Sequence, residues 1–146
     1  MFNNCYFPAP TVILQEVLDQ FNNCLFDGDA ASVIVNIAGS RWLRFTGCAF
    51  HAFGNDGNNT INAVELTTST KHSTNNIFSG CYFGRARYAA VENNLWDKGI
   101  EEADANQDFN LYVGCNGVDC GTALVELEGA NSKADAANNI GTVVAP

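Results

Sequence analysis

The chain has 146 residues, of which 47% are hydrophobic and 16% are charged, a composition that fits one folded domain and excludes intrinsic disorder. Seven Lys and Arg residues against sixteen Asp and Glu residues give a formal net charge of −9, which argues against binding to nucleic acid or anionic membranes. The longest apolar runs, such as residues 33–35, are far shorter than the roughly 20 residues of a membrane-spanning helix, and no signal-peptide pattern is visible at the N-terminus.

The first predicted element is a short motif that recurs along the chain, aromatic–x–x–Cys–x–Phe. Its copies lie at 2–7, 21–26, 45–50 and 78–83, and a degenerate fifth copy, in which Gly replaces the last Phe, lies at 112–117. The position directly before the cysteine holds only Asn or Gly: Asn4, Asn23, Gly47, Gly80 and Gly114. These two residue types adopt the left-handed backbone conformation at the lowest cost. The motif therefore predicts a strand that ends at the aromatic residue, a bend at Asn or Gly, and a second strand that begins at Cys.

A second motif, an apolar residue followed by a polar one, alternates with the first. We align Gln15, Asn36, Glu65, Glu92 and Glu126 as its polar positions. The spacing between successive motif cysteines grows along the chain, so we expect the extra residues at 54–59, 67–76 and 94–108 to be looped out between strands. The last of these segments is expected to include a short helix around 100–105.

Stacking of the two motifs predicts the core and the bends. The residues expected to be buried are Phe21, Cys24, Phe26, Val35, Phe45, Cys48, Phe50, Val64, Phe78, Cys81, Phe83 and Val91. We expect positive φ at Asn23, Gly47, Gly80 and Gly114.

The paired motifs resemble the right-handed parallel β-helix of the pectin-lyase-like superfamily, the architecture of phage tailspikes and virion surface proteins. The resemblance covers roughly residues 2–127. It implies an all-β solenoid of about five coils with looped-out insertions over 1–127, followed by a partial last coil or an extended C-terminal tail over 128–146. Because β-helices serve lyases, hydrolases, adhesins and tailspikes alike, the resemblance specifies a fold and not a function. No catalytic motif of the superfamily matches this chain residue by residue.

The cysteines lack the spacing of a zinc site, because no Cys-x-x-Cys pair is present. We expect Cys5, Cys24, Cys48 and Cys81 to form an inward-facing stack of small apolar side chains. Cys120 lies outside this stack on a predicted turn, where a disulfide to Cys115 or to another protein is a candidate.

The glutamates of the second motif are the candidate catalytic residues. Period-two alternation points Glu65, Glu92 and Glu126 outward in one column, about 5 Å apart, a spacing that resembles the carboxylate pair of a retaining glycosidase. The alternative, which we favour, is a solvated or subunit-facing polar column. Equivalent positions on a regular face give little reason for one carboxyl to be protonated and another ionised, as that chemistry requires. We expect no metal and no cofactor.

The first motif begins directly after Met1, so we expect the first coil to have no cap within this chain. Either the chain is a fragment of a longer β-helix or another protein supplies the cap, and we expect the protein to work as part of an assembly. The leading hypothesis is a bacteriophage virion structural protein, either a capsid decoration (minor capsid) protein or a spike component. We expect it on the particle surface as a homo-oligomer, specifically a trimer, in contact with major capsid or tail proteins. The alternatives are a tailspike-like glycan hydrolase or lyase, a receptor-binding module, and a bacterial surface adhesin, the last disfavoured by the missing export signal.

Overall fold

The computed structural model describes residues 1–8, 11–29, 33–53, 62–85, 96–117, 120–135 and 143–144. Their regular elements are all β-strands, arranged in three sheets. No stretch of this described part forms a helix with the length and apolar character needed to span a bilayer.

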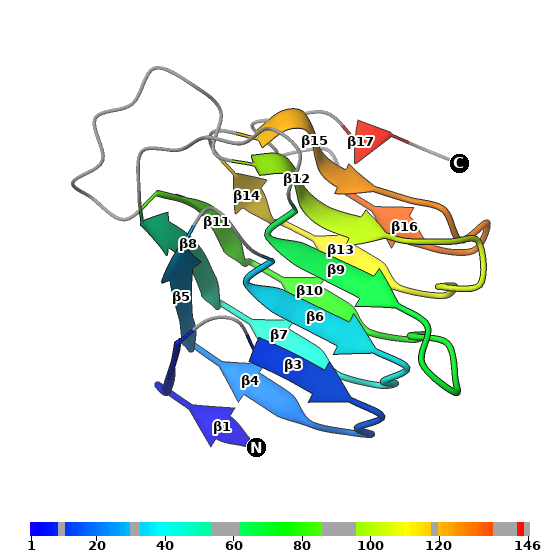
Figure 1. Cartoon of the computed structure of the whole chain (residues 1–146), viewed down its shortest axis with the longest axis horizontal. Helices are drawn as coiled ribbons and strands as arrows, with labels where there is room; N and C mark the ends of the chain where they lie inside the picture. The colour runs from blue at the N-terminus through cyan, green and yellow to red at the C-terminus, as the bar shows by residue number, and fades with distance from the viewer. Residues whose placement is uncertain are drawn as a thin grey trace.

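The three sheets are parallel throughout, and the chain visits sheets A, B and C in turn (Figure 1). Sheet A contains β1 (Phe2–Asn3), β4 (Gln20–Asn22), β7 (Arg44–Thr46), β10 (Ile77–Ser79), β13 (Leu111–Val113) and β16 (Lys133–Ala134). Sheet B contains β2 (Tyr6–Pro8), β5 (Leu25–Asp29), β8 (Ala49–Phe53), β11 (Tyr82–Arg85) and β14 (Asn116–Gly117). Sheet C contains β3 (Thr11–Leu14), β6 (Val35–Ala38), β9 (Val64–Thr67), β12 (Trp96–Glu102), β15 (Cys120–Glu126) and β17 (Val143–Val144).

Three consecutive strands, one from each sheet, make one rung of a stack. The first rung consists of β1, β2 and β3, and it forms one end of the stack, as Figure 1 shows. β16 and β17 lie at the other end and pair with β13 and β15, so residues beyond 127 continue sheets A and C. This all-β arrangement of stacked parallel sheets is compatible with a parallel β-helix.

The repeated motif sets the register of sheets A and B. Phe21 of β4 pairs with Phe2 and with Phe45, and Phe78 pairs with Phe45 and Tyr112. All residues predicted to be buried are buried, except that Val91 lies outside the described residues. The left-handed bends are also confirmed, with φ of 50° at Asn23, 60° at Gly47, 61° at Gly80 and 60° at Gly114.

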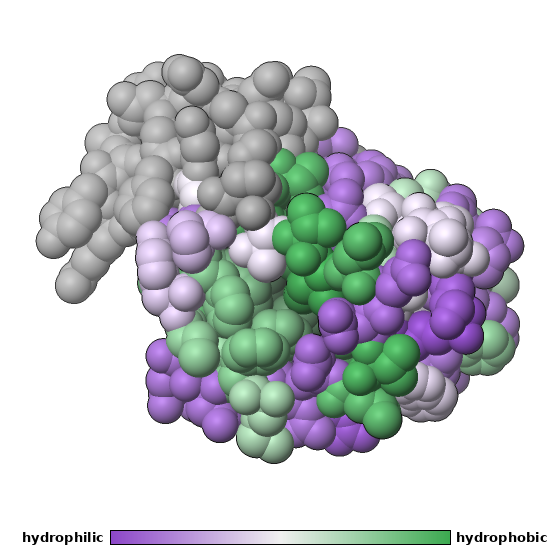
Figure 2. Space-filling view, turned by 60° about the horizontal axis from the view of Figure 1, so that its bottom comes forward, coloured by the Kyte–Doolittle hydropathy of each residue, from purple (hydrophilic) through white to green (hydrophobic). Residues whose placement is uncertain are grey.

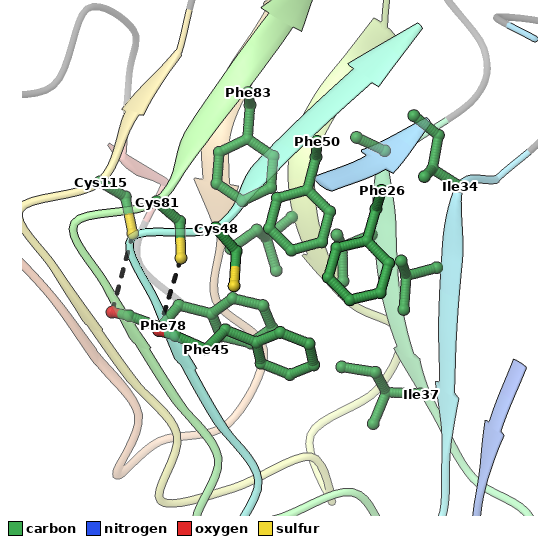
Figure 3. Close-up of a cluster of buried hydrophobic side chains, with 14 of the residues drawn as sticks. Phe26, Ile34, Ile37, Phe45, Cys48, Phe50, Phe78, Cys81, Phe83 and Cys115 are labelled. Atoms are coloured by element: carbon green, nitrogen blue, oxygen red, sulfur yellow. Dashed lines mark hydrogen bonds between the residues drawn. The ribbon is translucent and has the colours of Figure 1, made fainter. Parts of the chain in front are cut away.

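Two columns of aromatic rings and one column of thiols fill the interior (Figure 3). In sheet A the rings of Phe21, Phe45 and Phe78 stack with centroids 4.8 and 4.6 Å apart, and in sheet B the rings of Phe26, Phe50 and Phe83 stack at 5.0 and 4.7 Å. Between the two columns, the thiols of Cys24, Cys48, Cys81 and Cys115 each donate to the backbone oxygen of the aromatic residue one rung earlier. Examples are Cys48 to Phe21 at 3.3 Å and Cys81 to Phe45 at 3.5 Å. The cysteines thus pack as small apolar residues that also satisfy a backbone acceptor.

The corner between sheets C and A is held by polar side chains, which we call the corner ladder: Ser40, Ser73, Asn76, Gln107, Asn110 and Ser132. Each accepts a hydrogen bond from a backbone N–H one rung nearer the N-terminus. Asn76 Oδ1 accepts from Leu43 at 3.0 Å, Asn110 Oδ1 from Asn76 at 2.9 Å, and Ser73 Oγ from Ser40 at 3.2 Å. These corner amides lie outside the sheets, and buried amides require partners, so the ladder replaces the missing strand hydrogen bonds.

The helix expected around 100–105 is wrong, because Ile100, Glu101 and Glu102 belong to β12. This strand pairs with β9 on one side and β15 on the other. A helical turn there would leave the facing edges of both neighbours without partners, and the parallel ladder outweighs the local preference of a Glu- and Ala-rich segment. Of the other expected insertions, 54–59 lies outside the described residues.

Candidate functional site

The polar column predicted from the sequence lies on the outer face of sheet C. Asn36, Glu65, Glu101 and Glu126 are in register on β6, β9, β12 and β15. Glu65 and Glu126 hold the positions predicted for them. Glu101, and not Glu92, stands between them, and Glu92 itself lies outside the described residues. Residues 90–92 and 99–101 both end in an apolar residue followed by Glu, and the sheet uses the second of these segments.

The first member of the column was also assigned incorrectly. Val12 is level with Asn36, so the outer face of β3 is apolar at this position. Gln15 follows β3 in a left-handed bend with φ of 55°, and Gly39 makes the matching bend after β6 with φ of 67°. The alignment of Gln15 with Asn36 was therefore shifted by three residues.

Lys98 forms ion pairs with two of the three glutamates in this column. Its Nζ atom lies 2.6 Å from Glu101 Oε1 and 3.8 Å from Asp97 Oδ2, and it also forms an ion pair with Glu126 Oε2. Burial lowers the pKa of Lys98, but the hydrogen bonds and charges of Glu101 and Glu126 outweigh burial and raise it above its ordinary value. Lys98 is therefore a permanent cation that holds two neighbouring strands together.

Asn62 connects the remaining glutamate to this group. Its Nδ2 atom donates to Glu65 Oε1 at 3.1 Å and to Glu101 Oε2 at 2.6 Å. Burial raises the pKa of Glu65, the Asn62 hydrogen bond opposes the rise, and the neighbouring charge of Glu101 adds to it. Glu65 consequently differs from Glu101 and Glu126, which the lysine contacts directly.

This arrangement has one property of a glycosidase site and lacks another. A carboxyl with a raised pKa beside an ion-paired carboxylate is the asymmetry that a general acid and a nucleophile require. However, both carboxylates that would serve as nucleophile hold Lys98, which lowers their availability. The depression described below lies at the first rung and has none of these glutamates in its lining.

The two cysteines considered for a disulfide lie in different environments. Cys115 is buried in the thiol column, and its Sγ donates to the Phe78 oxygen at 3.7 Å. Cys120 begins β15, is half-buried and packs against the core. Both are thiols in this structure, as are the other four cysteines. An intermolecular link through Cys120 stays a prediction, and the burial of Cys115 makes that residue the poorer partner.

The first rung carries an apolar surface that the sequence motifs did not reveal. Val12 and Leu14 on β3 are 61% and 54% exposed, whereas Asn36 and Ala38 stand at the same positions in the next rung. Tyr6 on β2 is exposed as well. Figure 2, with the N-terminal end of the stack turned toward the viewer, shows hydrophobic side chains gathered on this end among polar ones. We call Phe2, Tyr6, Val12 and Leu14 the first-rung surface.

A depression of about 330 Å³ lies within this end of the stack. Phe2, Phe7, Ile13, Leu14 and Phe21 contribute its apolar lining, and the carboxylates of Glu16 and Asp19 also line it. β1, β2 and β3 are the outermost strands of their sheets, so each presents one edge without a strand partner within the described chain. Open edges and an apolar hollow together make this end a template for further β-structure.

The sequence motifs did not predict a second column of residues with left-handed backbone conformation. Leu18, Trp42, Asn75 and Phe109 lie at equivalent places in the corner between sheets C and A, with φ between 59° and 68°. We call these four residues the corner ridge. Leu, Trp and Phe do not favour this conformation, so residue type gave no signal. Their fixed distance of six residues before each motif cysteine is the signal that identifies them.

The described residues contain no cluster of three or more His, Cys, Asp or Glu side chains arranged to hold a metal ion. No protein-family model matches the chain, and neither does any curated protein or solved structure.

Proposed function

We propose that this chain is a right-handed parallel β-helix of the pectin-lyase-like kind that serves as a structural protein of a bacteriophage virion. Within the particle it acts as a capsid decoration (minor capsid) protein or as a spike component on the surface. It works by assembly, as a homo-oligomer in contact with major capsid or tail proteins, and carries out no catalysis.

The observation that supports this proposal is the first-rung surface. An isolated domain normally covers the open ends of its sheets, by caps or by charged residues, because unpaired edges associate with other strands. Here Val12 and Leu14 are exposed on β3, and the apolar hollow opens beside them. Open strand edges beside an apolar surface favour association with other β-structure.

Sedimentation of the purified protein and two variants tests the assembly role. We expect the wild type to form oligomers at micromolar concentration, and Val12→Lys and Leu14→Lys to shift it toward monomer with an unchanged melting temperature. Val113→Lys is the matched control, because Val113 is also an exposed strand residue but lies on β13. A thermally stable wild-type monomer contradicts the proposal. Immunogold labelling of purified virions then locates the protein on capsid or tail.

The raised pKa of Glu65 beside the ion-paired Glu101 favours a second candidate, a glycan-degrading enzyme. Incubation with host capsular and lipopolysaccharide glycans tests it. Release of reducing ends or unsaturated products that is lost in both Glu65→Gln and Glu101→Gln overturns the structural assignment. Products that persist in both variants point to a contaminant.

A further inference from the structure

We propose that the corner ridge at the first two rungs is a two-fold contact to a second, antiparallel copy of this chain. The inference rests on the proposed function only in that the chain acts by assembling. It concerns a different surface, the corner between sheets C and A.

Leu18 and Trp42 are the exposed centre of this surface. Both side chains extend from left-handed backbone, and they are 70% and 51% exposed. A bulky residue in this conformation costs about 1–2 kcal/mol, and such strain persists mainly where it positions a side chain for a purpose. Val17, next to Leu18, is exposed as well. Contact with water does not offset the backbone strain at Leu18 and Trp42, whereas burial of Val17, Leu18 and Trp42 against a partner would.

Charges of opposite sign flank this centre on adjacent rungs. Glu16 and Asp19 stand on either side of the exposed pair Val17 and Leu18, and Arg41 and Arg44 stand on either side of Trp42 and Leu43. The backbone shows that they are neighbours: Val17 forms a bridge with Arg41, and the Arg44 N–H donates to the Asp19 oxygen at 3.0 Å.

These four side chains are poorly matched within one copy. Among the described residues the Glu16 carboxylate and the Arg44 guanidinium form no ion pair. Asp19 lies 3.9 Å from the N-terminal amine, and Arg41 Nε donates to the His72 oxygen at 3.5 Å. The corner therefore offers two carboxylates and two guanidinium groups to a partner.

Symmetry decides the arrangement of that partner. A two-fold axis that runs between the first two rungs, perpendicular to the stack, sets Leu18 opposite the partner's Trp42. Arg41 is level with Val17 and Arg44 with Gln20, so the same rotation sets Glu16 one residue from the partner's Arg41 and Asp19 one residue from the partner's Arg44, within reach of these long side chains. Each pair occurs twice, as in any isologous interface. A parallel copy at the same height brings Arg41 against the partner's Arg44 instead, and the like charges repel.

Two charge reversals test the contact. Glu16→Arg and Arg41→Glu each place like charges opposite one another, and we expect each to raise the dimer dissociation constant on the order of tenfold or more. An equimolar mixture of the two variants restores opposite charges at both pairs, so it should dimerise as the wild type does. Sedimentation equilibrium measures all four samples. Glu128→Arg and Lys133→Glu repeat the same charge changes at exposed positions of the same corner but at the opposite end of the stack, beside β16, and should have no effect.

The mixing result is the decisive one. Restoration of the dimer only in the mixture supports the two-fold contact. Three outcomes overturn the two-fold contact. The mixture remains monomeric, the single variants keep the wild-type size, or the protein is a trimer that neither substitution affects. If the corner variants leave an oligomer that Val12→Lys disperses, the corner contact fails while the assembly role stands. If the corner variants disperse it and Val12→Lys does not, the first-rung surface fails instead.

Discussion

Among individual residues, a left-handed bend allows the free-energy cost of backbone conformation to be measured apart from the cost of side-chain packing. Gly80 has φ of 61°, and a Cβ atom built there meets nothing within 4 Å. Any penalty of a side chain at this position therefore comes from the backbone alone. We expect Gly80→Val to lower the free energy of unfolding by more than about 1 kcal/mol, since a β-branched residue resists this region. Gly80→Asn is the control and should be close to neutral, because Asn23 occupies the equivalent bend with φ of 50°. Urea denaturation measures both, and equal losses would contradict the assignment.

The pKa of Glu65 leads to a pH dependence of stability. Burial raises this pKa in the folded state, so the folded protein binds more protons than the unfolded chain just above the ordinary Glu value of about 4.3. Stability should therefore fall as the pH rises from that value through the raised pKa. Glu65→Gln removes this contribution, keeps an acceptor for Asn62, and should flatten the curve at pH values just above the ordinary Glu pKa. Glu128→Gln, at an exposed carboxylate, serves as the control. A variant curve as steep as the wild type would exclude Glu65 as the cause.

Residue type predicted one set of bends and missed the other for a physical reason. Asn and Gly adopt positive φ cheaply, so their recurrence before each cysteine was informative. Leu18, Trp42 and Phe109 adopt it against their own preference, and only the surrounding rungs impose it. The core was predictable because aromatic and cysteine positions recur at fixed spacing. The first-rung surface was not, because exposure at Val12 follows from where the stack ends.

At the level of strands, the sequence predicted that the glutamates of sheet C stack in register, but it did not identify every segment that forms a strand of that sheet. β9 and β15 supply Glu65 and Glu126 as expected, because their motifs stand alone in their segments. For the strand between them the chain offers two similar candidates, 90–92 and 99–101, and period-two alternation does not discriminate between them. The register of β12 on both neighbours selects Glu101. The sequence did not reveal the role of Lys98 for the same reason, because its ion pairs with Glu101 and Glu126 form only when residues 96–102 are the strand between β9 and β15.

The corner ladder should contribute measurably to stability. Asn76 accepts from the Leu43 N–H at 3.0 Å and donates to the Ser40 oxygen at 3.2 Å, and all three residues are buried. Asn76→Ala leaves the Leu43 N–H without a partner, whereas the Ser40 oxygen keeps the Thr74 N–H at 3.2 Å. The substitution should lower the free energy of unfolding by about 1–3 kcal/mol. Thr70→Ala, at an exposed site in the same connection, should change it by less than about 0.5 kcal/mol. Chemical denaturation of both variants checks the difference; similar values would mean that water replaces the amide.

For the assembled protein, the two proposed contacts should respond to salt in opposite ways. Ion pairs at the corner ridge weaken as salt shortens the screening length from about 10 Å at 0.1 M to about 3 Å at 1 M, whereas apolar contacts at the first-rung surface persist. We expect dimers that form through the corner to dissociate more readily at high salt. Association through the first rung should be unchanged or stronger. Sedimentation at both salt concentrations, with Val12→Lys to isolate the corner and Arg41→Glu to isolate the first rung, separates the two responses. Equal responses would show that one surface accounts for both.

The direction of the corner ladder has a consequence for biosynthesis. Each acceptor side chain lies one rung later in the chain than the N–H that it satisfies: Asn76 serves Leu43, Asn110 serves Asn76, and Ser132 serves Asn110. A ribosome makes the donor first, so every completed rung leaves the exit tunnel with open corner amides until the next rung is translated. Glu102 has the reverse order, an early acceptor with later donors, because its carboxylate accepts from Asn110, Tyr112, Glu128 and Gly129. It too stays without these partners until the following residues are translated. We therefore expect each rung to complete its corner hydrogen bonds only after the next rung has been translated.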